Sequence, residues 1–213
     1  MAISRNSFSN DRHLSRFAFL MQHYQAGKVL DIGNVGGLKG EGNANSFHHA
    51  FCAAAQNSTV YGFDLFDPKN GAEYPNQKKG NIEDGLPYED RFFDTIYMGE
   101  LIEHLSSLKS VLSEISRVLK DGGVFILDTP NPYSIQRIAK WILAREEDLG
   151  NPTHLIFFTP ASLTTLLTQH GFAVKTLSEK LSPASRFIPR WITKGFGSHL
   201  LVVAAKRNNP ATN

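Results

Sequence analysis

The densest group of chemically capable side chains lies in the stretch GELIEHL, which holds two carboxylates and an imidazole within five residues. If this stretch forms a helical turn, Glu100 stands at position i, with Glu103 and His104 at i+3 and i+4, so that all three share one face. Such a set can bind a hard divalent cation such as Mg²⁺ and leave positions open for substrate oxygens. His154, in NPTHLIFF, could supply a fourth ligand.

The same side chains also support chemistry without a metal. His104 could act as a general base, with Glu100 beside it, if the group being modified must lose a proton. In a third interpretation, Glu103 lies near a helix N-terminus and complements the helix dipole, while His104 packs or caps. The spacing leaves the three interpretations open, and in the first two we expect His104 and Glu100 to be the catalytic residues.

Short apolar runs alternate with helical periodicities along the chain, and these elements must position the reactive groups. The predicted strands are Lys28–Gly33, Val60–Phe66, Lys78–Asp84, Phe92–Met98, Gly123–Thr129, Phe172–Leu177 and His199–Ala205. The predicted helices are Arg12–Tyr24, Asn43–Ala55, the apolar stripe from Leu105 to Leu119, Ile135–Ala144 and Thr159–His170. This alternation predicts a doubly wound α/β fold, with a mostly parallel sheet covered on both faces. No helix separates the last two strands, so we expect that pair to be antiparallel.

Polar residues stand at five consecutive strand ends, which is where open α/β sheets bind their ligands. Gly33, after the first strand, would let a ligand approach the backbone closely. Asp64 is placed to accept two hydrogen bonds from a ribose diol, while Asn81 and the Ile82 backbone could address an adenine ring. Taken singly, Asp31 could be a structural carboxylate satisfied by backbone amides, and Asp64 a simple turn residue. The ordered set favours a nucleoside-like ligand.

The chain resembles class I S-adenosylmethionine-dependent methyltransferases over roughly Lys28 to Phe172. The resemblance is carried by KVLDIGNVGG, VYGFDLFD, GNIEDGLPYEDRFFDTIYMGELIEHL, ISRVLKDGGVFILDTPNP and NPTHLIFFTPASLTTLLTQHGF. It implies one Rossmann-like methyltransferase domain over residues 1–213, with a seven-stranded sheet whose last strand is antiparallel. It also implies that S-adenosylmethionine is held by Asp31, Gly33, Gly37, Asp64, Leu65, Asn81, Ile82, Met98 and Gly99. Metal-dependent small-RNA 2′-O-methyltransferases and ubiquinone-pathway O-methyltransferases in this family share the Glu-x-x-Glu-His turn.

The loop after the first strand departs from the family pattern, which usually reads Asp-x-Gly-x-Gly-x-Gly. Val35 occupies the middle glycine position, Gly36 follows it, and the next stretch, GLKGEGNANSFHH, is long. We therefore expect altered loop geometry. A dinucleotide dehydrogenase fits less well, because its G-x-G-x-x-G fingerprint should follow the first strand directly. The nearest match, GEGNAN, starts seven residues after Gly33 and ends in Asn45.

The methyl acceptor is expected beneath an inserted lid segment, Pro132–Pro152, whose helix combines apolar residues with Arg137, Lys140 and Arg145. This helix could simply pack on the core, or it could be an amphipathic cover for a lipid-linked or anionic substrate. We expect O-methylation of a small molecule, a glycan or a lipid-linked intermediate. The alternatives are a metal-dependent RNA 2′-O-methyltransferase and a non-catalytic protein that binds S-adenosylmethionine or a nucleoside.

The composition restricts which binding partners and which cellular compartment we expect for this protein. The 213-residue chain is 41% apolar with a net charge of +2, and it lacks the clustered basic stripe that is typical of nucleic-acid binding. A single cysteine, Cys52, excludes an internal disulfide, and the polar N-terminal stretch lacks the apolar core of a signal peptide, so we expect a cytoplasmic protein. No apolar run approaches the ~18 residues of a membrane span, which leaves peripheral contact as the expected form of any membrane association.

Overall fold

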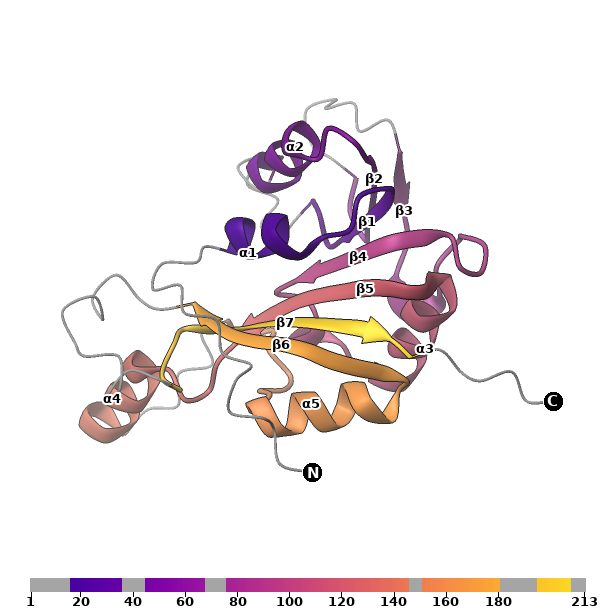
Figure 1. Cartoon of the computed structure of the whole chain (residues 1–213). Helices are drawn as coiled ribbons and strands as arrows, with labels where there is room; N and C mark the ends of the chain where they lie inside the picture. Colours follow the sequence, from indigo (N-terminus) through magenta and orange to yellow (C-terminus); the bar gives the residue numbers. More distant parts are fainter. Residues whose placement is uncertain (1–15, 36–44, 68–75, 146–150, 181–194, 208–213) are drawn as a thin grey trace.

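Seven strands form one sheet in the order β3-β2-β1-β4-β5-β7-β6 (Figure 1). The computed structural model describes residues 16–35, 45–67, 76–145, 151–180 and 195–207. The strands are β1 (Lys28–Ile32), β2 (Thr59–Asp64), β3 (Gln77–Lys79), β4 (Phe93–Gly99), β5 (Leu119–Pro130), β6 (Phe172–Lys180) and β7 (His199–Lys206). The pairs among β1 to β5 are parallel, and β7 runs antiparallel to both β5 and β6. The predicted Rossmann-like α/β fold with an antiparallel last strand is therefore confirmed.

Helices cover both faces of this sheet (Figure 1). They are α1 (Arg16–His23), α2 (Asn45–Ala54), α3 (Leu108–Val118), α4 (Ile135–Ala144) and α5 (Pro160–Gln169), with short 3₁₀ helices η2 (Ile82–Asp84) and η3 (Ile102–His104). Because successive side chains of a strand alternate between faces, Val29 of β1 joins the core under α1 and α2, whereas Leu30 joins the core under α3 and α5. Burial on both faces explains the unbroken apolar runs VFIL in β5 and LLVVAA in β7.

Several predicted elements have other bounds in the structure, the third strand and the long apolar stripe among them. The third strand is only Gln77–Lys79 at the sheet edge, and the residues predicted to continue it form η2 instead. The apolar stripe predicted as one helix extends past both ends of α3. Leu105 is buried before the helix begins, and Leu119 is already the first residue of β5. Apolar periodicity identifies which residues are buried, but it does not fix the ends of the element that buries them.

Candidate active site

The turn that follows β1 is held against the end of β2. Gly33 has a φ of +76°, which favours glycine, and its N–H donates to the Phe63 carbonyl at 2.9 Å. Asp64 accepts two backbone hydrogen bonds, from Val35 N–H to Oδ2 at 2.8 Å and from Phe66 N–H to Oδ1 at 2.9 Å. Val35, the departure from the glycine pattern, is buried. The start of the altered loop is thus anchored through the carboxylate that the sequence assigned to the ribose.

A buried imidazole lies against the aspartate of β1. His48 Nδ1 lies 2.7 Å from Asp31 Oδ2, and both side chains are buried between β1 and α2. On its other side, His48 Nε2 lies 3.5 Å from Cys52 Sγ. Burial opposes protonation of His48, but the hydrogen bonds to Asp31 and Cys52 outweigh it and raise the pKa of His48 to about 9. Asp31 is therefore a structural carboxylate in part, with an imidazole as partner where the sequence suggested backbone amides.

This pair makes stability depend on pH. A histidine whose pKa rises from 6.5 to about 9 on folding stabilises the fold fully below pH 6.5, and this contribution is lost as pH rises towards 9. We expect the free energy of unfolding to fall by about 2 kcal/mol between pH 6.5 and pH 9. Urea unfolding at both pH values, compared with the same measurement on His48→Gln, isolates the contribution of this side chain. An equal decrease in the variant would contradict the assignment.

The residues expected at the adenine lie at the end of β3. Asn81 Oδ1 accepts a hydrogen bond from Glu83 N–H at 3.1 Å and so caps η2. Ile82 is buried in the core, whereas the Leu65 side chain is 54% exposed beside the end of β2. Asn81 therefore fixes a turn whose backbone faces the same edge of the sheet as Asp64.

The other residues that were predicted to bind the cofactor are Met98 and Gly99 at the end of β4, and Gly37 in the loop after β1. The Met98 side chain is fully buried in the core, so it would border a ligand through its backbone. At Gly99, an added Cβ would collide with the Tyr97 hydroxyl and the Arg16 guanidinium, so these two groups close over the end of β4. Gly37 lies outside the described residues.

Glu100 occupies a backbone conformation that is uncommon for a residue with a side chain. Its φ is +49°, and its N–H donates to the Asp128 carbonyl at 2.9 Å. Its carboxylate contacts His199 Nε2 at 2.6 Å and also pairs with Arg16. Partial burial raises the pKa of Glu100, but His199 and Arg16 outweigh it and lower the pKa to about 2. Glu100 therefore stays ionised, and such a weak base is poorly suited to accept a proton at neutral pH.

The expectation that Glu100, Glu103 and His104 share one helical face is wrong. The left-handed backbone at Glu100 breaks the turn, and the 3₁₀ helix begins only at Ile102. As a result, the Glu100 carboxylate meets Arg16 and His199 instead of the other two side chains.

Arg16 of α1 bridges the ends of two strands. Its Nε lies 2.7 Å from Asp128 Oδ1 in β5, in addition to its contact with Glu100 after β4. The Tyr97 hydroxyl donates to Asp128 Oδ2 at 2.7 Å. Arg16 was not predicted as a site residue. A charged residue among the apolar residues of the first predicted helix was the one available signal.

Removing this arginine should leave a buried charge without its ion-pair partner. Asp128 is only 2% exposed, so we expect Arg16→Met to lower the free energy of unfolding by about 3 kcal/mol in urea denaturation. The matched control is Arg91→Met, because Arg91 pairs with Asp121 where both side chains are exposed, and there we expect a change below about 0.5 kcal/mol. Equal effects of the two substitutions would show that the Arg16–Asp128 pair adds no stability.

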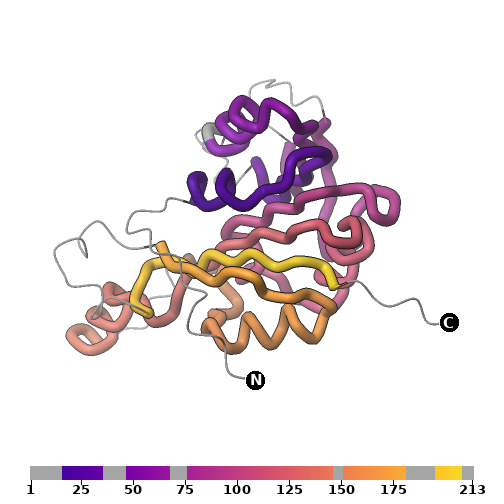
Figure 2. Tube along the Cα trace, in the orientation of Figure 1, coloured from indigo at the N-terminus to yellow at the C-terminus, as the bar shows by residue number. Residues whose placement is uncertain are grey.

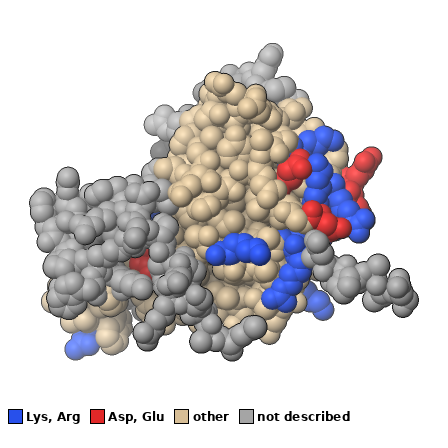
Figure 3. Space-filling view, viewed as in Figure 1, with Lys and Arg blue, Asp and Glu red and all other residues tan. Residues whose placement is uncertain are grey.

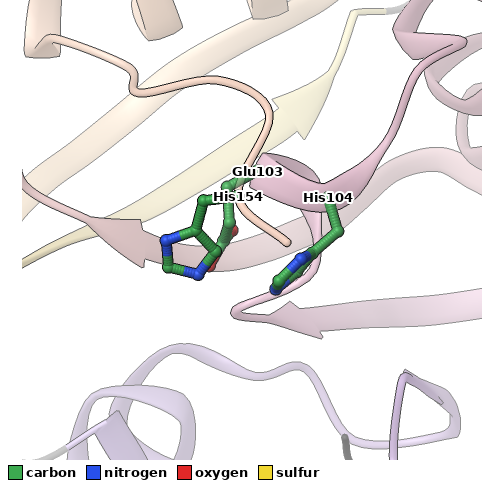
Figure 4. A group of neighbouring side chains, drawn as sticks. All are labelled: Glu103, His104 and His154. Atoms are coloured by element: carbon green, nitrogen blue, oxygen red, sulfur yellow. The ribbon is translucent and has the colours of Figure 1, made fainter. Parts of the chain in front are cut away.

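Glu103, His104 and His154 come together beside η3 (Figure 4). Their candidate ligand atoms all lie within 4.8 Å of one another. The Glu103 carboxylate is fully buried: Oε2 accepts from the Thr129 hydroxyl at 3.0 Å, and Oε1 lies 3.8 Å from His154 Nε2. Within the described part of the chain, Oε1 has no hydrogen-bond partner. Burial raises the pKa of Glu103 to about 7.

The segment after residue 150 holds the two imidazoles in place. His104 Nδ1 lies 3.0 Å from both the carbonyl and the hydroxyl of Thr153. In the tautomer that donates to the carbonyl, Nδ1 carries the proton and Nε2 keeps the lone pair. Leu155 N–H donates to the Glu103 carbonyl at 2.9 Å, and this contact brings His154 beside the carboxylate. An imidazole whose second nitrogen is fixed by a carbonyl is the usual arrangement of a metal-binding or proton-accepting histidine.

Comparison with known proteins identifies the family. A family model described as "Methyltransferase domain" matches residues 9–177. Among curated proteins, the chain is 36% identical over 106 residues to a probable S-adenosylmethionine-dependent methyltransferase of Mycolicibacterium smegmatis, covering 49% of this chain and 38% of that protein. It is 26% identical over 155 residues to the ubiquinone biosynthesis O-methyltransferase of Aeromonas salmonicida, covering 71% and 65% respectively. The matched part thus spans less than two thirds of either relative.

Solved structures agree at the level of the fold. An S-adenosylmethionine-dependent methyltransferase from Archaeoglobus fulgidus superposes with a TM-score of 0.64 at 20% identity, over 90% of this chain and 95% of that one. One from Listeria monocytogenes gives 0.60 at 19% identity, over 92% and 93%. The chain belongs to the methyltransferase domain family, and the resemblance to class I S-adenosylmethionine-dependent methyltransferases is confirmed. Among the described residues, no helix combines the length and apolarity needed to cross a bilayer.

Proposed function

We propose that this chain transfers a methyl group from S-adenosylmethionine to an oxygen atom of a small molecule, a glycan or a lipid-linked intermediate. The observation that carries the proposal is the ordered set of groups at the carboxyl ends of the parallel strands: the Gly33 turn, the Asp64 carboxylate and the Asn81 cap. Family membership supports the reaction class. The relatives include N-, C- and O-methyltransferases, so the proposal of oxygen as the acceptor atom rests on the proton-accepting side chains near the site.

In this proposal the chain acts mainly by positioning. Asp64 binds the ribose hydroxyls, which is compatible with its backbone contacts because a carboxylate offers about four acceptor sites. Asn81 and Ile82 contact the adenine, and the turn at Gly33 borders the methionine end. S-adenosylmethionine, when bound, supplies an electrophilic methyl group on a sulfonium. Holding donor and acceptor in a near-attack geometry can supply much of the rate enhancement of such a displacement.

A hydroxyl acceptor must also lose a proton, and the cluster of Glu103, His104 and His154 is suited to this. Glu103 Oε1 is buried and accepts no hydrogen bond from the described residues, which fits a divalent metal held by these three side chains. We expected Mg²⁺ from the sequence, but two imidazoles and one carboxylate fit Mn²⁺, Co²⁺ or Zn²⁺ better. A metal there would lower the pKa of a coordinated hydroxyl. Without a metal, His104 Nε2 is the group available to accept the proton.

A second candidate is metal-dependent 2′-O-methylation of RNA, which would use the same three side chains. Acceptor assays distinguish the two, because single-stranded RNA and small hydroxylated compounds can be tested in parallel.

The first experiment is calorimetric titration with S-adenosylhomocysteine, with NAD as the control ligand. We expect micromolar binding of S-adenosylhomocysteine and none of NAD. Turnover is then measured as transfer of a labelled methyl group to hydroxylated small molecules, glycans and RNA, with and without added metal. Absence of S-adenosylhomocysteine binding would refute the proposal. Binding without turnover on any acceptor class would instead support a non-catalytic binding protein.

A further inference from the structure

The single cysteine of the chain lies on the outer surface of α2, one helical turn after a buried histidine. Cys52 is exposed, whereas His48 is buried, and a spacing of four residues puts both on one side of the helix. His48 Nε2 lies 3.5 Å from Cys52 Sγ, which is a hydrogen-bonding distance for sulfur. The sulfur is thus open to solvent on one side and in contact with an imidazole on the other.

A buried carboxylate completes the arrangement. Asp31 Oδ2 lies 2.7 Å from His48 Nδ1, and these two side chains are only 4% and 2% exposed. A nucleophile, a base beside it and a third group that orients the base are the parts of an activated nucleophile. β1 and α2 hold these parts in the order carboxylate, imidazole and thiol, from the core to the surface. The arrangement is therefore more than an isolated exposed cysteine.

The charge of His48 favours the reactive form of the sulfur. Burial opposes protonation of His48, but the hydrogen bonds to Asp31 and Cys52 raise its pKa to about 9, so the imidazole holds both protons at neutral pH. Nδ1–H then donates to Asp31 and Nε2–H to Sγ, which stabilises a thiolate, the form of cysteine that attacks electrophiles. α2 contains no Lys or Arg, and its C-terminal end disfavours a negative charge, so the stabilisation must come from His48.

The surface around this thiol is uncharged. α2 lies at the upper end of the molecule in Figure 2, away from α4 and α5. In the view of Figure 3, the described surface at this upper end shows no Lys, Arg, Asp or Glu, and the sequence of α2 contains none. Small reagents should therefore reach Cys52 with little electrostatic steering, whatever their charge.

We propose that Cys52 is a modification site for low-molecular-weight disulfides. The thiolate attacks one sulfur of the disulfide, the bond between the two disulfide sulfurs breaks, and a new bond joins that sulfur to Cys52 Sγ. The other half leaves as a thiolate and takes up the proton that Cys52 released. Cys52 is thereby oxidised, and the leaving thiol is the reduced product. Because the chain has no second cysteine to displace the adduct, the mixed disulfide persists until an external thiol reverses it.

The test measures how fast the full chain reacts with dithiodipyridine, a neutral disulfide, at about pH 6.5, where an ordinary thiol is about 1% ionised. The released thiopyridone reports Cys52 alone, because the chain has one cysteine. We expect the folded chain to react about tenfold faster than the same chain unfolded in urea, since a larger thiolate fraction outweighs the lower nucleophilicity of a stabilised thiolate. A folded chain that reacts no faster than the unfolded one would overturn the proposal.

Two substitutions separate the effect of the imidazole from that of exposure. His48→Gln removes the charge and should slow the folded chain about tenfold, to the rate of the unfolded chain. His49→Gln is the matched control, because it removes the exposed histidine next in sequence, and it should change the rate less than about twofold. Equal rates in the unchanged and His48→Gln chains would contradict the proposal. If His48→Gln does not fold, the comparison of folded and unfolded unchanged chain decides alone.

The reactivity of Cys52 does not depend on methyl transfer, although Asp31 is also one of the residues expected at the cofactor. Calorimetry with S-adenosylhomocysteine on the same preparation keeps the two proposals apart. Rapid reaction of Cys52 in a chain that binds no S-adenosylhomocysteine would support the modification site and refute the proposed function. Binding of S-adenosylhomocysteine by a folded chain whose thiol reacts only at the unfolded rate would do the reverse.

Discussion

Asp64→Ala should weaken binding of S-adenosylhomocysteine about a hundredfold, because hydrogen bonds to a charged group contribute about 1.5–3 kcal/mol each. We assign two roles to the Asp64 carboxylate. It accepts the N–H groups of Val35 and Phe66, which hold the loop after β1 and the turn after β2, and it would receive the ribose hydroxyls. Removing it therefore loses ligand contacts and loosens the turn that borders them. Calorimetric titration measures the change directly.

The control for this experiment is Asp67→Ala. Asp67 lies three residues further along the chain, but its side chain is 67% exposed and pairs with Lys79. We expect the Asp67→Ala chain to bind S-adenosylhomocysteine with an affinity within about twofold of that of the unchanged chain, since an exposed ion pair contributes little. Urea unfolding of the Asp64 variant shows whether the fold survives. A well-folded Asp64→Ala chain with unchanged affinity would mean that Asp64 only ties down the loop, as in the simple turn interpretation.

The sheet could be predicted from the sequence because burial on both faces leaves a plain signature. β5 and β7 carry the continuous apolar runs VFIL and LLVVAA, and the helices between strands show a 3.6-residue period. The antiparallel setting of β7 followed from the absence of a predicted helix between it and β6. These features depend on residues close together in the chain, which is why local patterns were sufficient.

The side-chain pairs at the site could not be predicted in this way. His48 reaches Asp31 across 17 residues, and Arg16 reaches Asp128 from a different layer of the fold. Spacing along the chain carries no information about such contacts. The turn after β4 failed for another reason: a left-handed residue at Glu100 redirects one side chain of a motif that would be continuous in a helix.

Because the Glu100 side chain points away, the candidate metal site consists of Glu103, His104 and His154. Substitution of Glu103 is the second change for which we expect a large effect. Glu103→Gln should weaken binding of Co²⁺ at least about a hundredfold, because Gln keeps the size of the side chain but removes the negative charge that an ion would neutralise. The absorption spectrum of bound Co²⁺ reports this without any activity assay. Glu89→Gln, at an exposed position outside the cluster, is the matched control and should leave binding unchanged.

The outcome also decides how the acceptor loses its proton. If the unchanged chain binds Co²⁺ and Glu103→Gln abolishes both binding and methyl transfer, the metal interpretation of the turn holds. If the unchanged chain binds no metal in the presence of S-adenosylhomocysteine, His104 Nε2 remains as the base. His104→Ala should then reduce transfer by about 10²–10⁴-fold while leaving cofactor affinity intact. Normal transfer by both variants would exclude the cluster from the reaction, leaving Glu103 as a buried carboxyl bonded to Thr129.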